Sequence, residues 1–241
     1  LPLPLLISAL PVLVVGLWED IARRVCPTHR LLAAFVSAAL ASALAQGVIT
    51  RLDLPHVDGW LAYLPFAMPL TWFMVAGACN AINLIDGTHG LAGGTALLMF
   101  VGMAIVAGDA GDKLVLAQAA GMTGALMGFL LWNYPRGKVF LGDAGAYFIG
   151  FMYAQLSIQL VARNAGISPW FVVALAAYPI VETLFSIYRR KIVRALSFYD
   201  NTPALIGFTL IYGIYYIVCY RKVVRLSGDM MPRLSTPSAT A

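Results

Sequence analysis

The chain has 241 residues, of which 61% are hydrophobic and 11% are charged. Its mean hydropathy is +0.82, which excludes an ordinary water-soluble domain and predicts an integral membrane protein. The net charge of +5 does not indicate a nucleic-acid partner. The basic residues lie in short segments between apolar runs, where such residues fix the orientation of a membrane protein.

A helix that crosses the lipid bilayer needs roughly 20 apolar residues, and seven stretches of the chain approach this length. They are residues 2–17, 31–49, 60–79, 90–107, 114–132, 145–162 and 169–188. An eighth stretch, 204–220, is shorter, and we expect it to be re-entrant or to lie along the interface. The prediction is one all-α domain over residues 1–241, a polytopic membrane helix bundle with about seven or eight spans.

Lysine and arginine are distributed unevenly between the two sides of these predicted spans. The loops on one side carry nine of them, against three on the other side. The nine are Arg23, Arg24, Arg30, Arg136, Lys138, Arg189, Arg190, Lys191 and Arg194, and the three are Arg51, Lys113 and Arg163. Because basic loops stay inside, the richer side is predicted to face the cytoplasm.

Carboxylates gather on the same predicted side, directly at the ends of spans. Glu19 and Asp20 lie in "GLWED", Asp86 in "NLIDG" and Asp143 in "FLGDAG", and each of these segments contains a glycine. Carboxylate and amide oxygens suit Mg²⁺, which is usually held by one or two carboxylates and completed by substrate phosphates. Mn²⁺ is the alternative metal. Charged anchors at the membrane interface would also explain the first segment.

Two further patterns surround these acids. In "NAINLIDG", the spacing places Asn80, Asn83 and Asp86 on one helical face, and such a polar stripe is costly in a membrane unless it is used. "GKVFLGDAG" places Lys138 and Asp143 around two glycines, which allows backbone N–H groups to approach a phosphate. A structural hydrogen-bond cluster and a plain turn are the respective alternatives.

Taken together, these segments resemble the polyprenyl-phosphate N-acetylhexosamine-1-phosphate transferase family. The resemblance extends from Gly16 to Arg190 and includes "GLWEDIARRV", "NAINLIDGTHGLAGG", "KVFLGDAGAYFIGF" and "YPIVETLFSIYRR". It implies an enzyme of the bacterial inner membrane with its active site facing the cytoplasm. Such an enzyme moves a sugar-1-phosphate from a UDP-sugar to undecaprenyl phosphate with Mg²⁺ and releases UMP. This step starts a lipid-linked glycan such as O-antigen or another cell-envelope polysaccharide.

The resemblance also implies roles for individual residues. Asp20, with Glu19 beside it, would orient the lipid phosphate or take its proton, and Asp143 would be a metal ligand, with Asp86 as a second one. A covalent nucleophile is the alternative role for Asp143. Contacts with the donor would come from Asn80, Asn83, Asp86 and His89, from Lys138 at a phosphate, and from Phe140 stacked on the uracil.

The chain departs from the family pattern in two places. His89 stands where relatives commonly have a second acid, so an imidazole would have to make the uracil contact. The region 189–241 lacks the relatives' histidine motif and leaves Arg189 and Arg190, with Lys191 and Arg194, to meet the donor phosphates. The alternatives are an inactive fragment or paralogue of this family and, with less support, a membrane transporter. Partners implied are the UDP-sugar, the polyprenyl phosphate, the bilayer and, as an open option, a second copy in a homodimer.

Overall fold

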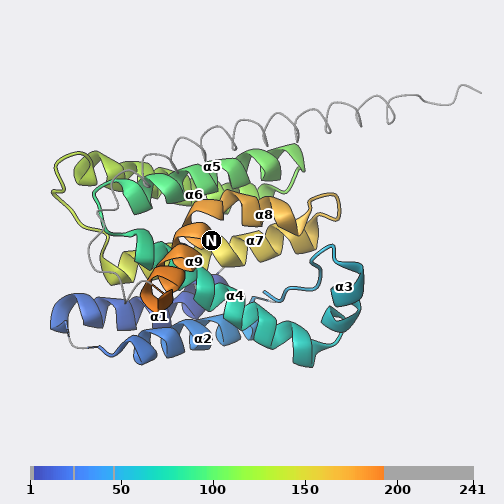
Figure 1. The fold of residues 1–241 in the computed structure, drawn as a ribbon. Helices are drawn as coiled ribbons and strands as arrows, with labels where there is room; N and C mark the ends of the chain where they lie inside the picture. Colours follow the sequence, from blue (N-terminus) through green and yellow to red (C-terminus); the bar gives the residue numbers. More distant parts are fainter. Residues whose placement is uncertain (1–2, 24, 46, 193–241) are drawn as a thin grey trace, which may run out of the picture. The chain divides into compact units, whose positions relative to one another are not determined.

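The computed structural model describes residues 3–23, 25–45 and 47–192, and every regular element in those ranges is a helix. This confirms the all-α prediction. The helices are α1 (Leu3–Ala22), α2 (Pro27–Leu44), α3 (Pro55–Leu61), α4 (Leu64–Ile85), α5 (Leu91–Asp109), α6 (Lys113–Asn133), α7 (Gly142–Arg163), α8 (Pro169–Leu175) and α9 (Ala177–Ile192) (Figure 1). The chain up to Arg189 forms one compact unit, and the predicted segment 204–220 lies outside the described residues.

Fewer of these helices qualify as spans than the sequence predicted. Within the described ranges, α1, α4, α5, α6 and α7 are long and apolar enough to cross a membrane, and α8 with α9 passes the same test only if the pair counts as one span. That gives five or six spans where seven stretches were expected. One of the missing spans is α2, whose 18 residues include His29 and Arg30, and the other, when five are counted, is the bent α8–α9 pair.

Two predicted boundaries were wrong for reasons visible in the local sequence. The stretch 31–49 is helical only to Leu44 but begins earlier, because Pro27 starts α2 directly after the extended Cys26. The stretch 60–79 is interrupted before Leu64 and then continues to Ile85. The polar stripe of "NAINLIDG" therefore forms the last turns of α4, which ends at Ile85 and has Asp86 as its C-cap.

The predicted span 169–188 is two helices that meet at an angle of 69°. α8 ends at Leu175 and α9 begins at Ala177, with Pro179 in its first turn. Proline has no N–H to donate, and its ring clashes with the carbonyl four residues earlier, which here belongs to Leu175. Pro179 therefore favours a kink or break at this point, and here the chain bends, whereas Pro11 and Pro69 lie inside α1 and α4 without dividing them.

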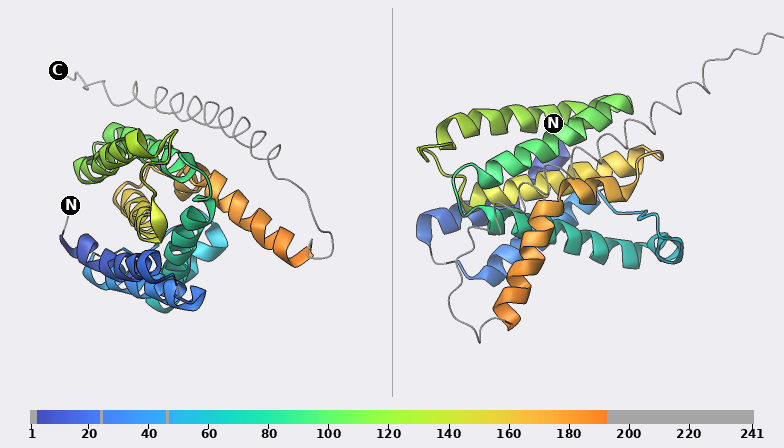
Figure 2. Two further views of the ribbon diagram at one scale, coloured as in Figure 1. Left: turned by 90° about the vertical axis from the view of Figure 1, so that its left-hand side faces the viewer. Right: turned by 45° about the horizontal axis from the view of Figure 1, so that its top comes forward.

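α7 is the central helix of the compact unit, and it packs against α1 and α4 and also contacts α2, α5, α6 and α8. Seen end-on, it lies between the α1–α2 pair and the α5–α6 pair (Figure 2). Twelve of its residues are buried, including Phe151, Met152 and Leu156. Burial on all sides is what a helix hydrophobic around its whole circumference requires.

Two glycines allow α1 and α4 to approach α7 closely. A Cβ added to Gly16 of α1 would lie 2.5 Å from the Cα of Ala144, and one added to Gly150 of α7 would lie 2.6 Å from the Cα of Cys79 in α4. Small residues at such crossings let membrane helices pack backbone to backbone. Asp20 and Asn83 each lie four residues beyond these contacts, so both side chains reach the start of α7.

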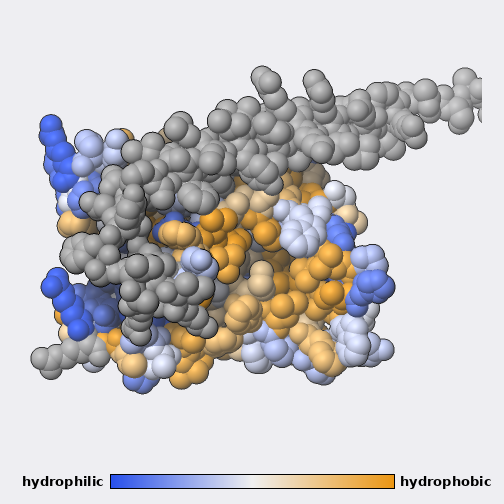
Figure 3. All heavy atoms as spheres, viewed as in Figure 1, coloured by the Kyte–Doolittle hydropathy of each residue, from blue (hydrophilic) through white to orange (hydrophobic). Residues whose placement is uncertain are grey.

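The chain runs back and forth, so that α1, α4 and α6 end where α2, α5 and α7 begin. We call this the acidic end. Figure 3 shows hydrophobic residues over the middle of the visible face and hydrophilic ones toward its two ends. Exposed aromatic residues lie at both ends, with Trp18, Trp132 and Tyr134 at the acidic end and Trp60, Tyr63 and Trp170 at the other. Aromatic belts of this kind mark the two interfaces of a bilayer.

Candidate active site at the acidic end

The start of α7 is capped by a carboxylate from a distant part of the chain. The backbone N–H groups of Asp143 and Ala144 donate to the two carboxylate oxygens of Asp20, at 2.8 and 3.1 Å. The first helical residue, Gly142, has φ +68°, and Leu141 before it provides no side-chain cap. A negative charge at a helix N-terminus is stabilised by the unpaired N–H groups and the helix dipole. Asp20 is therefore fixed beside Asp143.

The carboxylate of Asp143 has a protein partner on each oxygen. The side-chain amide of Asn83 donates to Oδ1 at 2.7 Å, and Nη1 of Arg30 donates to Oδ2 in a short ion pair. The side chains of Arg30 and Asp143 are each 21% exposed. The site thus combines α1, α2, α4 and α7, and any ligand of Asp143 must share it with a guanidinium group.

Asp86 lies near both of these acids. Burial raises the pKa of Asp86 above its usual range, the charges of Asp143 and Asp20 raise it further, and His89 lowers it. A carboxyl group that resists ionisation beside two carboxylates is a place where a cation lowers the electrostatic free energy. The three acids therefore gather at one end of the bundle, as predicted.

The donor set fits Mg²⁺, although it does not form a closed cage. Among the described residues, no three His, Cys, Asp or Glu side chains are grouped so as to surround a metal ion. Mg²⁺ does not require such a group, because it keeps several waters and takes one or two carboxylates plus substrate phosphates. Asp86 and Asp143 are the carboxylates that would be available to such an ion at this end of the bundle.

Two predicted site residues have their polar groups engaged inside the protein. Glu19 accepts from the N–H of Val25 at 2.7 Å through one carboxylate oxygen, so it holds the turn between α1 and α2 and has a different partner from Asp20. Asn80 accepts from the hydroxyl of Tyr147 at 3.0 Å and donates to the carbonyl of Ala76 at 2.8 Å. Glu19 therefore fixes the α1–α2 turn, whereas Asn80 links α4 to α7 through Tyr147.

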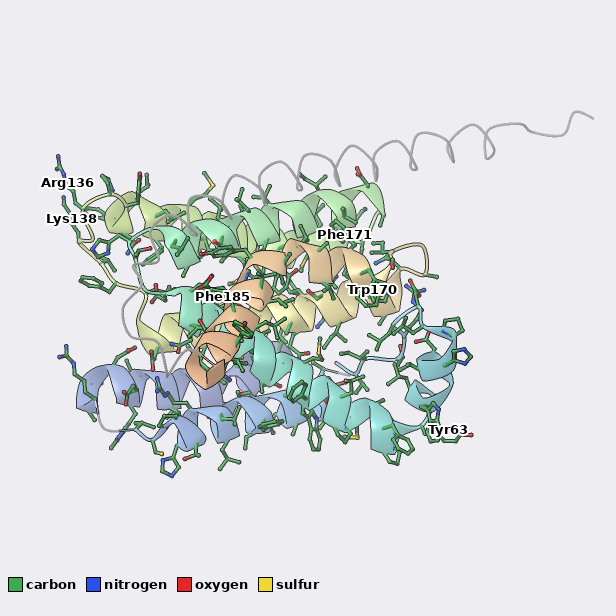
Figure 4. The ribbon with its side chains drawn as sticks, viewed as in Figure 1. Tyr63, Arg136, Lys138, Trp170, Phe171 and Phe185 are labelled. Atoms are coloured by element: carbon green, nitrogen blue, oxygen red, sulfur yellow. The ribbon has the colours of Figure 1, made fainter. Side chains whose placement is uncertain are left out.

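The remaining predicted residues lie on the two neighbouring loops. The rings of His89 and Phe140 are 5.3 Å apart between centroids and inclined by 58°, and Phe140 is 71% exposed. The ammonium group of Lys138 lies 5.5 Å from the centre of the Trp132 ring. It projects with Arg136 from the α6–α7 loop, at the end opposite Tyr63 and Trp170 (Figure 4). The side chains of Arg189 and Arg190 lie outside the described part of the chain.

Two residues of this site were not predicted from the sequence. Arg30 was expected only as one of the basic loop residues, and Tyr147 was not expected at the site. Arg30 is 113 positions from Asp143 in the chain, so no local spacing links the two. Tyr147 follows Asp143 by four residues in α7, and this helical spacing was the available signal. Arg30 pairs with Asp143 and Tyr147 donates to Asn80, so both residues belong to the candidate site.

These features define a polytopic membrane protein with an oxygen-rich, basic-rimmed site at one membrane face. The family model for glycosyl transferase family 4 matches residues 3–161, which include Asp20, Asn83, Asp86 and Asp143. The chain belongs to this family.

Curated relatives agree with this assignment. A protein of Bacillus subtilis (strain 168), a probable undecaprenyl-phosphate N-acetylglucosaminyl 1-phosphate transferase, is 34% identical over 133 residues, which cover 55% of this chain and 36% of that protein. A phospho-N-acetylmuramoyl-pentapeptide-transferase of Halalkalibacterium halodurans is 36% identical over 114 residues, or 47% of this chain and 35% of its own length.

An undecaprenyl-phosphate alpha-N-acetylglucosaminyl 1-phosphate transferase of Yersinia pestis is 33% identical over 166 residues, or 65% of this chain and 45% of its own. The chain therefore spans less than half the length of each of these relatives.

Proposed function

We propose that the protein transfers a sugar-1-phosphate from a UDP-sugar to undecaprenyl phosphate, with Mg²⁺ or, alternatively, Mn²⁺ as cofactor. A phosphate oxygen of the lipid attacks the phosphorus that carries the sugar, the bond to the bridging oxygen breaks, and UMP leaves. The relatives' names support this reaction class. The observation that carries the proposal is Asp20, which caps α7 directly beside Asp143.

Phosphoryl transfer between two anions depends on positioning and on charge neutralisation. A divalent cation held by Asp86 and Asp143 would neutralise the donor pyrophosphate. Arg30 pairs with Oδ2 of Asp143. If that oxygen turned to bind the cation, the guanidinium group of Arg30 would be free to bind an incoming phosphate. Asn83 orients Asp143 through its second oxygen.

Asp20 is the group proposed for the lipid phosphate. Its carboxylate is exposed at the end of α1, and the N–H groups of α7 hold it in place. There it orients the phosphate that attacks, or takes its remaining proton at a carboxylate oxygen.

The proposed orientation places the acidic end in the cytoplasm of a bacterial inner membrane. At that end Arg23, Arg136 and Lys138 have exposed or partly exposed side chains. At the opposite end, Arg51 pairs with Asp53 at 3.1 Å and Arg163 pairs with Asp112 at 2.7 Å. The sequence segments at the acidic end carry more Lys and Arg than those at the opposite end, where Lys113 is also exposed, and this supports the orientation.

A transporter is less well supported, because the acids of the site gather at one end of the helices and not midway along them. The test is a transfer assay with membranes, Mg²⁺, undecaprenyl phosphate and a panel of radiolabelled UDP-sugars. We expect a lipid-linked radioactive product, and the productive donor identifies the sugar. No product with any donor, from protein shown to be inserted, would favour the inactive paralogue.

A further inference from the structure

One buried amide joins the two loops that carry His89 and Phe140. Asn133, the last residue of α6, is 5% exposed. Its Oδ1 accepts from the N–H of Gly90 at 2.6 Å, and its Nδ2 donates to the carbonyl of Val139 at 2.8 Å. These bonds require an acceptor and a donor on one short side chain, which among side chains of this size only an amide supplies.

The two bonded backbone groups are the immediate neighbours of the two rings. Gly90 follows His89, and Val139 precedes Phe140. The Asn133 amide therefore fixes the backbone next to each of these two ring-bearing residues. Asn133 also accepts at its own carbonyl from the N–H of Gly137 at 2.7 Å. The end of α6 therefore holds the α4–α5 turn and the α6–α7 loop at once.

The two loops are packed too closely to shift independently. Gly90 has φ +82°, and a Cβ there would lie 2.8 Å from the ring of Tyr134. Gly137 has φ +57°, and a Cβ there would lie 2.5 Å from the imidazole of His89. Both positions need glycine, for the backbone conformation and for the space. The imidazole of His89 therefore packs against the backbone of the α6–α7 loop at Gly137.

We propose that Asn133 is a positioning residue, which holds His89 and Phe140 as the two walls that receive the planar base of the nucleotide donor. The inference rests on the proposed function, because that function supplies the uridine nucleotide. A ring-lined site binds a base by stacking, and stacking is effective only if the walls are fixed before the base arrives. Asn133 touches neither ring and acts through the backbone.

The test compares Asn133→Ala with a matched control, Asn164→Ala. Asn164 lies at the end of α7, where its amide also makes two bonds, to Asp112 and to the carbonyl of Leu160. Both variants lose a helix-end amide, but only the first lies near the two rings. UDP binding to the purified full chain in nanodiscs is measured by calorimetry, alongside hydrogen exchange of the Gly90 amide.

We expect Asn133→Ala to weaken UDP binding about tenfold, the effect of losing most of one stacking contact. The KM for the donor should rise by a similar factor while kcat changes less, and the Gly90 amide should exchange faster. In Asn164→Ala the UDP affinity should be unchanged. Adding Phe140→Leu to Asn133→Ala should cause little further loss, because both remove the same contact.

Unchanged UDP affinity in Asn133→Ala, or a loss that adds fully to that of Phe140→Leu, would overturn the inference. If Asn133→Ala does not fold, Asn133→Asp replaces it, since this variant keeps the acceptor for Gly90 and loses only the donor to Val139. If the wild type binds no uridine nucleotide, the proposed function fails. The exchange of the Gly90 amide then still decides whether Asn133 holds the loop, and an unchanged rate in Asn133→Ala would refute that role.

Discussion

Gly142 offers the sharpest test of how Asp20 is held against α7. The residue has φ +68°, and a Cβ added to it would lie 2.6 Å from Oδ2 of Asp20 and 2.9 Å from Oδ1. In Gly142→Ala the carboxylate must therefore retreat by about 0.8 Å to reach the ordinary contact distance of 3.4 Å. That movement lengthens the bonds from the N–H groups of Asp143 and Ala144, now 2.8 and 3.1 Å.

The free energy of unfolding should fall for two separate reasons. The left-handed backbone costs a residue with a Cβ about 1 to 2 kcal/mol. Each weakened hydrogen bond costs about 0.5 kcal/mol, at the low end of the usual range, because Asp20 is exposed. The sum is about 2 to 3 kcal/mol. Activity should fall by about 100-fold, as expected when a reacting group is displaced by roughly 1 Å.

Gly111→Ala is the control, because Gly111 has φ +72° at the opposite end of the bundle and a Cβ there would meet nothing within 4 Å. It should cost only the backbone strain and leave activity near wild type. Thermal unfolding in detergent and the transfer assay measure the two quantities for both variants. If Gly142→Ala retains activity within about threefold of Gly111→Ala, where 100-fold is expected, the placement of Asp20 is not what catalysis requires.

Three substitutions of the acids follow from the same geometry. Asp143→Asn should abolish transfer while the protein stays inserted, because an amide keeps the volume but loses the charge proposed to hold Mg²⁺; substantial activity would remove Asp143 from the metal role. Asp20→Asn should lower kcat more than it weakens UDP-sugar binding, and the reverse pattern would move Asp20 to the donor side. The raised pKa of Asp86 means that its ionisation destabilises the fold at pH values above the usual Asp range, so Asp86→Asn should raise the Tm of metal-free protein at pH 7 and lose this advantage as the pH falls toward 4. Mg²⁺ should raise the Tm of the wild type more than that of Asp86→Asn, and equal Tm values at pH 7 without metal would contradict the reasoning.

The sequence predicted the helices and the side of the bundle on which the acids lie, because both follow from local patterns. Apolar runs of membrane length predict helices whatever they pack against. Glycines and acids at the ends of such runs must lie at a membrane face, so Asp20, Asp86 and Asp143 were expected to gather there. The fold class is confirmed, whereas the chemical roles of these residues stay predictions.

The pairings could not be predicted, because they depend on which helices become neighbours. Arg30 reaches Asp143 only because α2 lies beside α1 and α7, and Asn133 reaches Gly90 only because α6 lies beside α5. Glu19 and Asp20 are adjacent in sequence but point to different partners. The bend between α8 and α9 had a local signal in Pro179, which a reading by hydropathy alone does not register.

The central claim is that the acidic end joins a UDP-sugar to a polyprenyl phosphate, and its products test this most directly. Purified protein in nanodiscs is incubated with Mg²⁺ and the donor panel, with and without undecaprenyl phosphate, and UMP and lipid-linked sugar are quantified together. We predict that UMP is released only with the lipid, in equal amount to the lipid-linked product, and that Asp20→Asn and Asp143→Asn lose both products. UMP released without the lipid, or both products formed equally well by the two variants, would contradict the account.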